Sequence, residues 1–193
     1  LMHKAEDILM GTAAVIPIYY YNDLYLQRTD VEGIYSNLFG FKYFQFATCP
    51  RDVLKINLAS EPAKVDPALN SSVDGACLAV NMFEGLYTYD AEGQLQPALA
   101  ESTEVSEDGM TYTFTLRDGL KWSDGTDLTA KDFEYAWKRA AAPETAADYG
   151  YMFDAIAKNA DGTLDVVASE DGKTLTVKLV APCAYFLDLA AFP

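Results

Sequence analysis

Acidic side chains dominate the residues of this sequence that could perform chemistry. The 193 residues include 29 Asp and Glu against 14 Lys and Arg, which gives a formal net charge of −15. With so many carboxylates, some pair must lie close enough for the acid and base roles of glycoside hydrolysis. The sequence singles out no two of them, so an acidic hydrolase remains an alternative without specific support.

Nucleophilic and metal chemistry lack the residues that they need. The one histidine is His3, near a terminus where chains fray, so Ser–His–Asp or Cys–His catalysis has no well-placed base. Cys49, Cys77 and Cys183 are too widely separated for the paired ligands of a zinc site, and three thiols cannot all pair with one another. We expect free thiols or small buried side chains rather than a disulfide, with no metal and no cofactor.

Aromatic side chains are the remaining candidates, and they suit binding better than catalysis. The chain has 13 Tyr, 10 Phe and 2 Trp, with clusters at Tyr19-Tyr20-Tyr21 and Tyr149-Gly150-Tyr151. Tyrosine offers a flat apolar face and a hydroxyl that donates or accepts a hydrogen bond, which favours a ligand-binding wall. Core packing is the alternative for each tyrosine, because alternate residues of a strand must face inward.

The negative charge also excludes classes of partner. Nucleic acids and anionic lipids attract basic patches, and the only adjacent basic pair is Lys138 and Arg139, within a predicted helix. Apolar runs fall well short of the roughly 20 residues that span a bilayer, and the first residues lack a signal peptide's apolar stretch. We therefore expect a soluble chain with no nucleic-acid partner and no targeting signal.

Local patterns predict the elements that must position these residues. Helices are predicted at 2–12, 74–86 and 182–191, and a further helix begins at a capping box at Thr129 and ends before Pro143. Strands are predicted at 13–21, 53–60 and 111–117, with a strand leading into a turn over 87–93 and a hairpin over 164–180. Antiparallel strands with segregated helices indicate an α+β fold, with a mixed or antiparallel sheet and packed helices.

Several motifs, taken in order, carry a resemblance to a known family. They are Asp66-Pro67-Ala68-Leu69-Asn70 with Phe83-Glu84-Gly85-Leu86, Leu99-Ala100-Glu101-Ser102, the strand at 112–117 with Lys121-Trp122-Ser123-Asp124-Gly125-Thr126, and Thr129-Ala130-Lys131-Asp132-Phe133 with Trp137-Lys138-Arg139. Through them, residues 53–193 resemble the amino-terminal part of bacterial extracellular solute-binding proteins of family 5, the oligopeptide-binding proteins of ABC importers.

The first residues resemble the other end of the same family. The motifs are Lys4-Ala5-Glu6-Asp7-Ile8-Leu9, Ile16-Pro17-Ile18-Tyr19-Tyr20-Tyr21 and the aromatic stretch at 37–44. The resemblance implies a circular permutation, in which a C-terminal segment, 1–48, is joined near Thr48–Arg51 to an N-terminal segment, 49–193. It further implies that Leu1 and Pro193 mark where the second lobe was cut away. Together we expect one compact domain, one lobe of a periplasmic-binding-protein-like clamshell of type II, cluster C.

The resemblance implies a binding protein and not an enzyme. The parent would be an extracellular or cell-envelope lipoprotein that captures oligopeptides and docks an ABC permease. The family's ligand contacts fall here on Tyr21, Asn70, Ser71, Ser72, Val73 and Tyr149. Ser71 stands where some oligopeptide binders have an acid that helps to hold the peptide's amino terminus, and serine does not supply that charge.

Two alternatives to peptide capture remain open on the sequence. In the first alternative the chain is a folded structural fragment that binds no ligand. In the second it is a receptor lobe for a non-peptide solute such as a nickel complex. If the lobe binds a peptide, we expect weak binding, because half of a clamp leaves the ligand exposed to water. The face that normally meets the second lobe is expected to be apolar and to offer a route to self-association.

Overall fold

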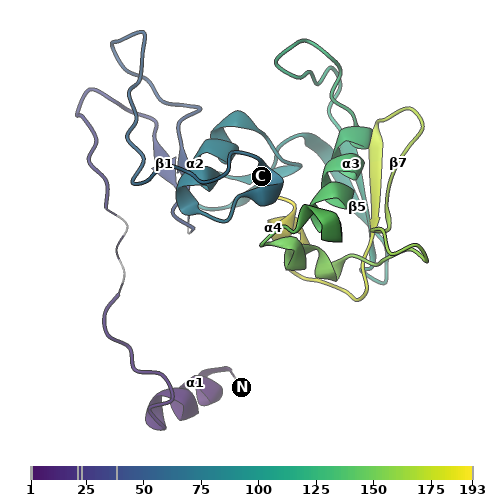
Figure 1. Ribbon diagram of the computed structural model, residues 1–193, viewed down its shortest axis with the longest axis horizontal. Helices are drawn as coiled ribbons and strands as arrows, with labels where there is room; N and C mark the ends of the chain where they lie inside the picture. Colours follow the sequence, from purple (N-terminus) through teal and green to yellow (C-terminus); the bar gives the residue numbers. More distant parts are fainter. Residues whose placement is uncertain (1, 21, 23, 38, 193) are drawn as a thin grey trace.

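The structure is a computed structural model that describes residues 2–20, 22, 24–37 and 39–192 (Figure 1). Its helices are α1 (Met2–Gly11), α2 (Val73–Met82), α3 (Ala130–Ala141) and α4 (Phe186–Leu189), with short 3₁₀ turns η1 (Pro67–Leu69), η2 (Pro143–Thr145) and η3 (Gly150–Ala155). Its strands are β1 (Tyr35–Ser36), β2 (Lys42–Tyr43), β3 (Tyr87–Tyr89), β4 (Leu95–Pro97), β5 (Ala100–Val105), β6 (Thr111–Leu116), β7 (Val166–Ala168) and β8 (Thr174–Lys178). All strand pairs are antiparallel, and the predicted α+β class is confirmed.

A four-stranded sheet in the order β5-β6-β8-β7 forms the main body. Strand β6 confirms the predicted alternation, since Tyr112, Phe114 and Leu116 are buried whereas the threonines between them are half-buried. Phe114 is fully buried and pairs in register with Leu175 of β8, which is fully buried as well. A strand with a neighbour on each side satisfies its backbone hydrogen bonds along its whole length.

Helix α3 packs on this sheet and presents one apolar side to it. Its start is the predicted capping box, in which the Asp132 carboxylate accepts a hydrogen bond from the Thr129 backbone N–H at 2.7 Å. Phe133 and Trp137 pack against the main core, and the Glu134 carboxylate accepts from the Ala168 N–H of β7 at 2.8 Å. The helix ends before Pro143, as predicted, because the residue before a proline is driven out of the helical region.

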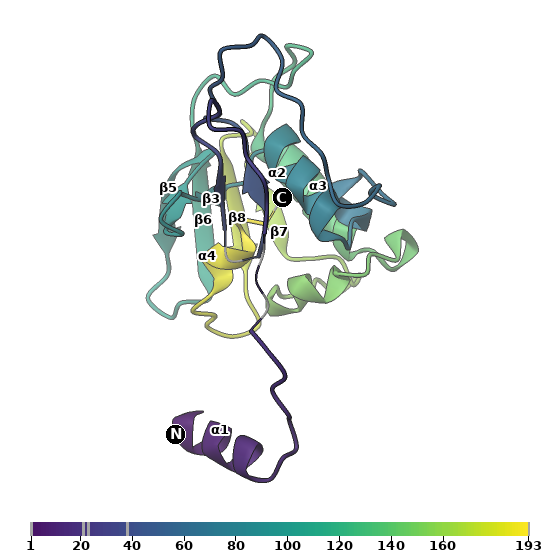
Figure 2. The ribbon, with the colours of Figure 1, turned by 90° about the vertical axis from the view of Figure 1, so that its left-hand side faces the viewer.

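A smaller layer, built on α2 and the β1–β2 hairpin, lies beside the main body, as both views show (Figures 1 and 2). Its core joins Phe41 and Tyr43 to Ala76 and Cys77 of α2. The Asn81 amide fastens the two parts, accepting from the Phe44 N–H at 2.7 Å and donating to the Lys42 carbonyl at 2.7 Å. Residues 41–44 therefore pack onto α2, which lies later in the chain.

Residues 2–20 do not join either layer (Figures 1 and 2). Helix α1 forms as predicted, but none of its residues is buried. The strand predicted at 13–21 is wrong where the structure describes it, because residues 13–20 form no strand and Tyr20 is 96% exposed. An extended segment becomes a strand only when a neighbour accepts and donates its backbone hydrogen bonds.

Other predictions need correction, and one of them is the helix predicted at 74–86, because α2 ends at Met82. Residues 53–60 are also not a strand, and no strand pairing joins them to the described residues 13–20. The last helix is shorter than the predicted 182–191, since α4 spans only Phe186–Leu189. As predicted, the three cysteines form no disulfide, and Cys77 and Cys183 are buried whereas Cys49 is partly exposed.

Candidate ligand-binding groove

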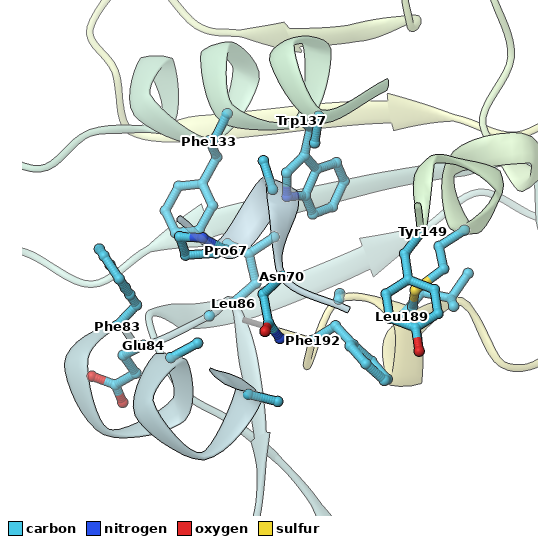
Figure 3. Close-up of a pocket in the computed structure, with 18 of the residues that line it drawn as sticks. Pro67, Asn70, Phe83, Glu84, Leu86, Phe133, Trp137, Tyr149, Leu189 and Phe192 are labelled. Atoms are coloured by element: carbon cyan, nitrogen blue, oxygen red, sulfur yellow. The ribbon is translucent and has the colours of Figure 1, made fainter. Parts of the chain in front are cut away.

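A groove between α2 and α3 has a volume of about 1190 Å³. Figure 3 shows Phe133 and Trp137 projecting from α3 into it, towards Pro67 and Asn70. Phe83 and Glu84 lie at one end of the groove, and Tyr149 and Leu189 lie at the other. Ligand pockets of drug-sized molecules hold about 300–1,000 Å³, so this groove has room for a short extended chain.

The loop from Asp66 to Val73 forms a polar part of the groove wall, and local sequence explains its shape. Asp66 caps η1 by accepting from the Ala68 N–H at 3.0 Å, and Pro67 suits the first position of the turn. The Asn70 amide donates to the Ser72 carbonyl at 3.0 Å and accepts from the Ser72 hydroxyl at 3.1 Å. The loop is therefore held by its own side chains.

The amino terminus of α2 continues this network. The Ser72 hydroxyl accepts from the Gly75 N–H at 3.1 Å and so caps the helix. A Cβ at position 75 would lie 1.8 Å from the Asn70 side-chain oxygen, so only glycine leaves room for this arrangement. Asn70, Ser72 and Gly75 form one interlocked unit.

Five of the predicted ligand-contacting residues meet on this groove. Asn70, Ser71, Ser72 and Val73 line it from the loop, and Tyr149 lines it from the start of η3. Val73 is 53% exposed and Tyr149 is 44% exposed, so both side chains are accessible to a ligand. The sixth predicted residue, Tyr21, lies outside the described residues. Contact with a ligand remains a prediction for all six.

Sequence reasoning missed the aromatic walls. The spacing of Phe133 and Trp137 is that of the core face of a helix, but each of them packs on the core and also lines the groove. Phe39 and Phe41 close another side against Phe192, with ring centroids 5.4 and 5.9 Å from that of Phe192. The sequence signal for such a wall is a periodic apolar face on a helix. A helix that packs on a core shows the same periodicity, so the pattern does not distinguish the two roles.

Every charged side chain that lines the groove among the described residues has a partner. The pairs are Arg139 with Asp66, Glu84 with Arg117, Lys121 with Asp127, Asp132 with Thr129, and Asp188 with the hydroxyl of Tyr89. The Arg139 guanidinium holds the pKa of Asp66 below its usual range, while burial and the neighbouring Asp188 hold the pKa of Tyr89 well above its own. Recognition in this groove therefore depends on apolar surface and hydrogen bonds more than on free charge.

The described residues contain no candidate metal centre. No group of three or more His, Cys, Asp or Glu among them could hold a metal ion. Within the same described part, no helix has the length and apolarity needed to cross a membrane.

Comparison with known protein families gives the decisive match. The family model described as bacterial extracellular solute-binding proteins, family 5 middle, matches residues 94–193, which is more than half of the chain. This chain belongs to the family 5 bacterial extracellular solute-binding proteins. The match confirms the predicted resemblance. Proteins of family 5 bind solutes and are not enzymes, so the prediction that this chain is not an enzyme is confirmed as well.

The family 5 relatives are named mostly for peptides. The chain is 43% identical to the oligopeptide-binding protein OppA of Bacillus subtilis over 150 residues, covering 74% of this chain and 27% of OppA. It is 40% identical to the probable deoxycholate-binding periplasmic protein YgiS of Escherichia coli, covering 75% of this chain and 29% of YgiS. The chain thus spans little more than a quarter of the length of these relatives.

Solved structures agree with this assignment. The crystal structure of Haemophilus influenzae OppA in complex with the peptide RPPGFSPFR aligns with a TM-score of 0.64 at 36% identity. The alignment covers 68% of this chain and 28% of that protein. The chain therefore has the fold of a part of the family 5 periplasmic binding proteins.

Proposed function

We propose that this chain is the ligand-contacting part of one lobe of a receptor that captures oligopeptides outside the cell for an ABC importer. The single observation that carries the proposal is the groove between α2 and α3, onto which the loop 70–73 and Tyr149 converge. The relatives named for oligopeptides and the peptide-bound relative support the peptide as ligand.

The groove has the features that an extended peptide needs. Main-chain groups of a peptide require hydrogen-bonding partners, and the polar loop with Asn70, Ser71 and Ser72 offers them along one wall. The aromatic and aliphatic walls accept varied side chains, because apolar burial is non-directional. Since the charges that line the groove are paired, the termini of the peptide find no free counter-ion among its described residues.

Binding by this lobe alone is weak in our proposal. A groove that is open on one side leaves part of the ligand in water and omits the contacts of an opposing wall. We expect a dissociation constant of about 1 mM or weaker for a short peptide.

Amide NMR of the whole chain, titrated with RPPGFSPFR, tests the proposal. We expect shifts concentrated at Ser71, Ser72, Val73 and the backbone of Tyr149, because these residues line the groove. Tyr149→Ala should weaken the response, whereas Tyr135→Ala, a tyrosine that is 70% exposed and outside the groove, should not. Shifts absent up to saturating peptide, or spread evenly over the surface, would contradict peptide capture by this groove.

A second candidate ligand is an amphipathic steroid such as deoxycholate. The relative YgiS, named as probably deoxycholate-binding, is 40% identical, and an apolar groove with paired charges suits a rigid apolar ligand. The same titration with deoxycholate below its micelle concentration separates the two candidates. Groove shifts with deoxycholate and none with the peptide would favour the steroid.

We infer that the two segments of this chain stand in the reverse of their order in the family. Residues 1–48 correspond to the carboxyl-terminal end of a family protein, and residues 49–193 correspond to its amino-terminal part. The packing of Phe41 and Tyr43 on α2 supports one unit to which the later part of 1–48 contributes. Separately expressed 1–48 and 49–193 should then associate into one folded species, as measured by NMR. Independent folding of 49–193 with no effect of 1–48 would argue against the joint unit.

The location and further partners follow from the same proposal. The parent receptor acts outside the cytoplasmic membrane, anchored as a lipoprotein, and delivers its solute to an ABC permease. The apolar lining of the open groove, the face that would meet the second lobe, offers a surface for self-association. Sedimentation across a range of protein concentrations measures it, and a concentration-independent monomer would rule it out.

A further inference from the structure

A bidentate ion pair ties α3 to the loop that lines the groove. The Arg139 guanidinium donates to Asp66 through both terminal nitrogens, at 3.1 Å to Oδ1 and 2.5 Å to Oδ2. The two side chains are 37% and 35% exposed, so water reaches them only in part. A planar guanidinium facing a carboxylate in this way gives a charge-assisted contact with a defined direction.

Arg139 itself is held in place at the end of α3. It lies in the last turn of the helix, where a cation interacts favourably with the helix dipole. The Thr145 hydroxyl donates to the Arg139 carbonyl at 2.6 Å, which fixes the backbone from which the guanidinium extends. The arginine is therefore a stiff connection and not a freely moving surface side chain.

Asp66 passes this restraint on to the groove wall. One of its carboxylate oxygens caps η1 at Ala68, and its backbone carbonyl accepts from the N–H groups of Leu69 and Asn70, each at 3.0 Å. Asn70 is in turn interlocked with Ser72, the N-cap of α2. A continuous series of polar contacts thus runs from the end of α3 to the start of α2.

We propose that Arg139 is a positioning residue for ligand binding, which acts through Asp66 to hold the loop 67–73 at a set distance from α3. This role rests on the proposed function, because the loop matters to binding only if the groove is the binding site. Apart from the polar loop, the groove is lined mainly by apolar side chains, so without this connection its two sides gain by closing on each other and burying Phe133 and Trp137. The pair keeps the groove open and the loop ordered before the ligand arrives.

The test compares variants of the whole chain by amide NMR, first without ligand and then with RPPGFSPFR as probe. For Arg139→Ala we expect the amide resonances of residues 68–73 to move and to exchange faster with solvent, while Phe114 and Leu175 report an intact sheet. The peptide-induced shift at low peptide concentration should fall about tenfold, because preorganisation of the loop is lost.

Two conservative variants separate positioning from general stability. Arg139→Lys keeps the charge but not the bidentate geometry, so loop order and peptide response should lie between those of the wild type and Arg139→Ala. Asp66→Asn keeps an acceptor for the Ala68 N–H and removes the charge, so it should reproduce the loop changes of Arg139→Ala. Lys138→Ala is the matched control, because this neighbouring cation pairs with Glu134 at 2.6 Å and does not line the groove.

The outcomes are distinguishable. If the wild type binds the peptide and Arg139→Ala leaves both the loop resonances and the peptide response unchanged, the positioning role is overturned. If the wild type does not respond to the peptide, the proposed function fails. The ligand-free spectra still decide the role of Arg139 in that case, since an unmoved loop overturns it and a displaced loop supports it.

Discussion

Residues 111–116 and 53–60 carry the same alternation of apolar and polar side chains, yet only the first segment is a strand. Strand β6 lies between β5 and β8 and buries Phe114 completely. In the other segment Leu54 and Leu58 are partly exposed and Ile56 is 48% exposed. The alternation thus indicates which side chains would share a face in a strand. Partner strands decide whether the strand forms and buries that face.

Removing one apolar side chain from each segment should give the largest difference in the free energy of unfolding. We expect Phe114→Ala to lower the free energy of unfolding by about 3–5 kcal/mol, because it leaves a cavity in the main core. Ile56→Ala should change it by less than about 0.5 kcal/mol, since the side chain is half exposed. Chemical denaturation of both variants measures the difference, and a comparable loss for Ile56→Ala would mean that 53–60 is packed in solution.

A smaller effect distinguishes two turns with an identical sequence. Ser-Glu-Asp-Gly occurs at 106–109, between β5 and β6, and at 169–172, between β7 and β8. The glycines have φ values of 69° and 72°, and each serine hydroxyl donates to the aspartate two residues later at 2.5 Å. The tertiary surroundings of the two glycines differ. A Cβ added at Gly172 would lie 3.0 Å from the Cβ of Thr129, whereas a Cβ added at Gly109 would lie 3.5 Å from the Cβ of Pro182.

Alanine at each glycine measures what the surroundings add. Both Gly109→Ala and Gly172→Ala should lose about 1–2 kcal/mol of unfolding free energy, because alanine is strained at positive φ. We expect Gly172→Ala to lose about 1 kcal/mol more, because Thr129 at the start of α3 must move. Thermal unfolding of the pair provides the measurement, and equal losses would show that Thr129 yields without cost.

The smallest expected effect is the response of these turns to acid. The Ser106 hydroxyl and the Met110 N–H lower the pKa of Asp108, and the Ser169 hydroxyl and the Lys173 N–H lower that of Asp171, with the Lys173 charge adding to the effect. A carboxyl whose pKa is lower in the folded state stabilises the protein above its unfolded pKa, about 3.9 for aspartate. That contribution is lost as the pH falls through the folded pKa.

Asparagine variants isolate this contribution. Asp108→Asn and Asp171→Asn remove the titrating group, so each should show a shallower loss of stability than the wild type between pH 5 and the acid limit of folding, roughly pH 2–3. Denaturant unfolding at a series of pH values provides the comparison. A variant whose stability falls as steeply as that of the wild type would mean that its aspartate titrates alike in both states.

The parts of the fold that were predictable share one property, which is that nearby residues specify them. The capping box at Thr129, the end of α3 before Pro143 and the alternation of β6 all lie within a few residues of the groups that they control. The strands expected at 13–21 and 53–60 depended on partners distant in sequence, and the described residues supply none. The last helix was too long in the prediction because an apolar run alone does not set where a helix ends.

The site was predictable in its positions but not in its shape. Motif order led to the loop 70–73 and Tyr149, and the structure brings these residues onto one groove. The aromatic wall of α3 and the link between Arg139 and Asp66 were not foreseen, because nothing in the sequence relates two residues 73 positions apart. Such pairs are visible only once the helix is packed on its sheet.

The sequence by itself determined the local geometry of this protein. Two copies of Ser-Glu-Asp-Gly fold into matching turns, and two copies of Asp-Gly-Thr, at 124–126 and 161–163, make the same pair of hydrogen bonds at 2.9 and 2.7 Å. Short side chains reach only their own backbone neighbours, so the turn is complete within itself. Tertiary structure alone decided which alternating segment became a strand and which apolar helix face became a groove wall, because burial depends on surfaces that distant parts of the chain provide.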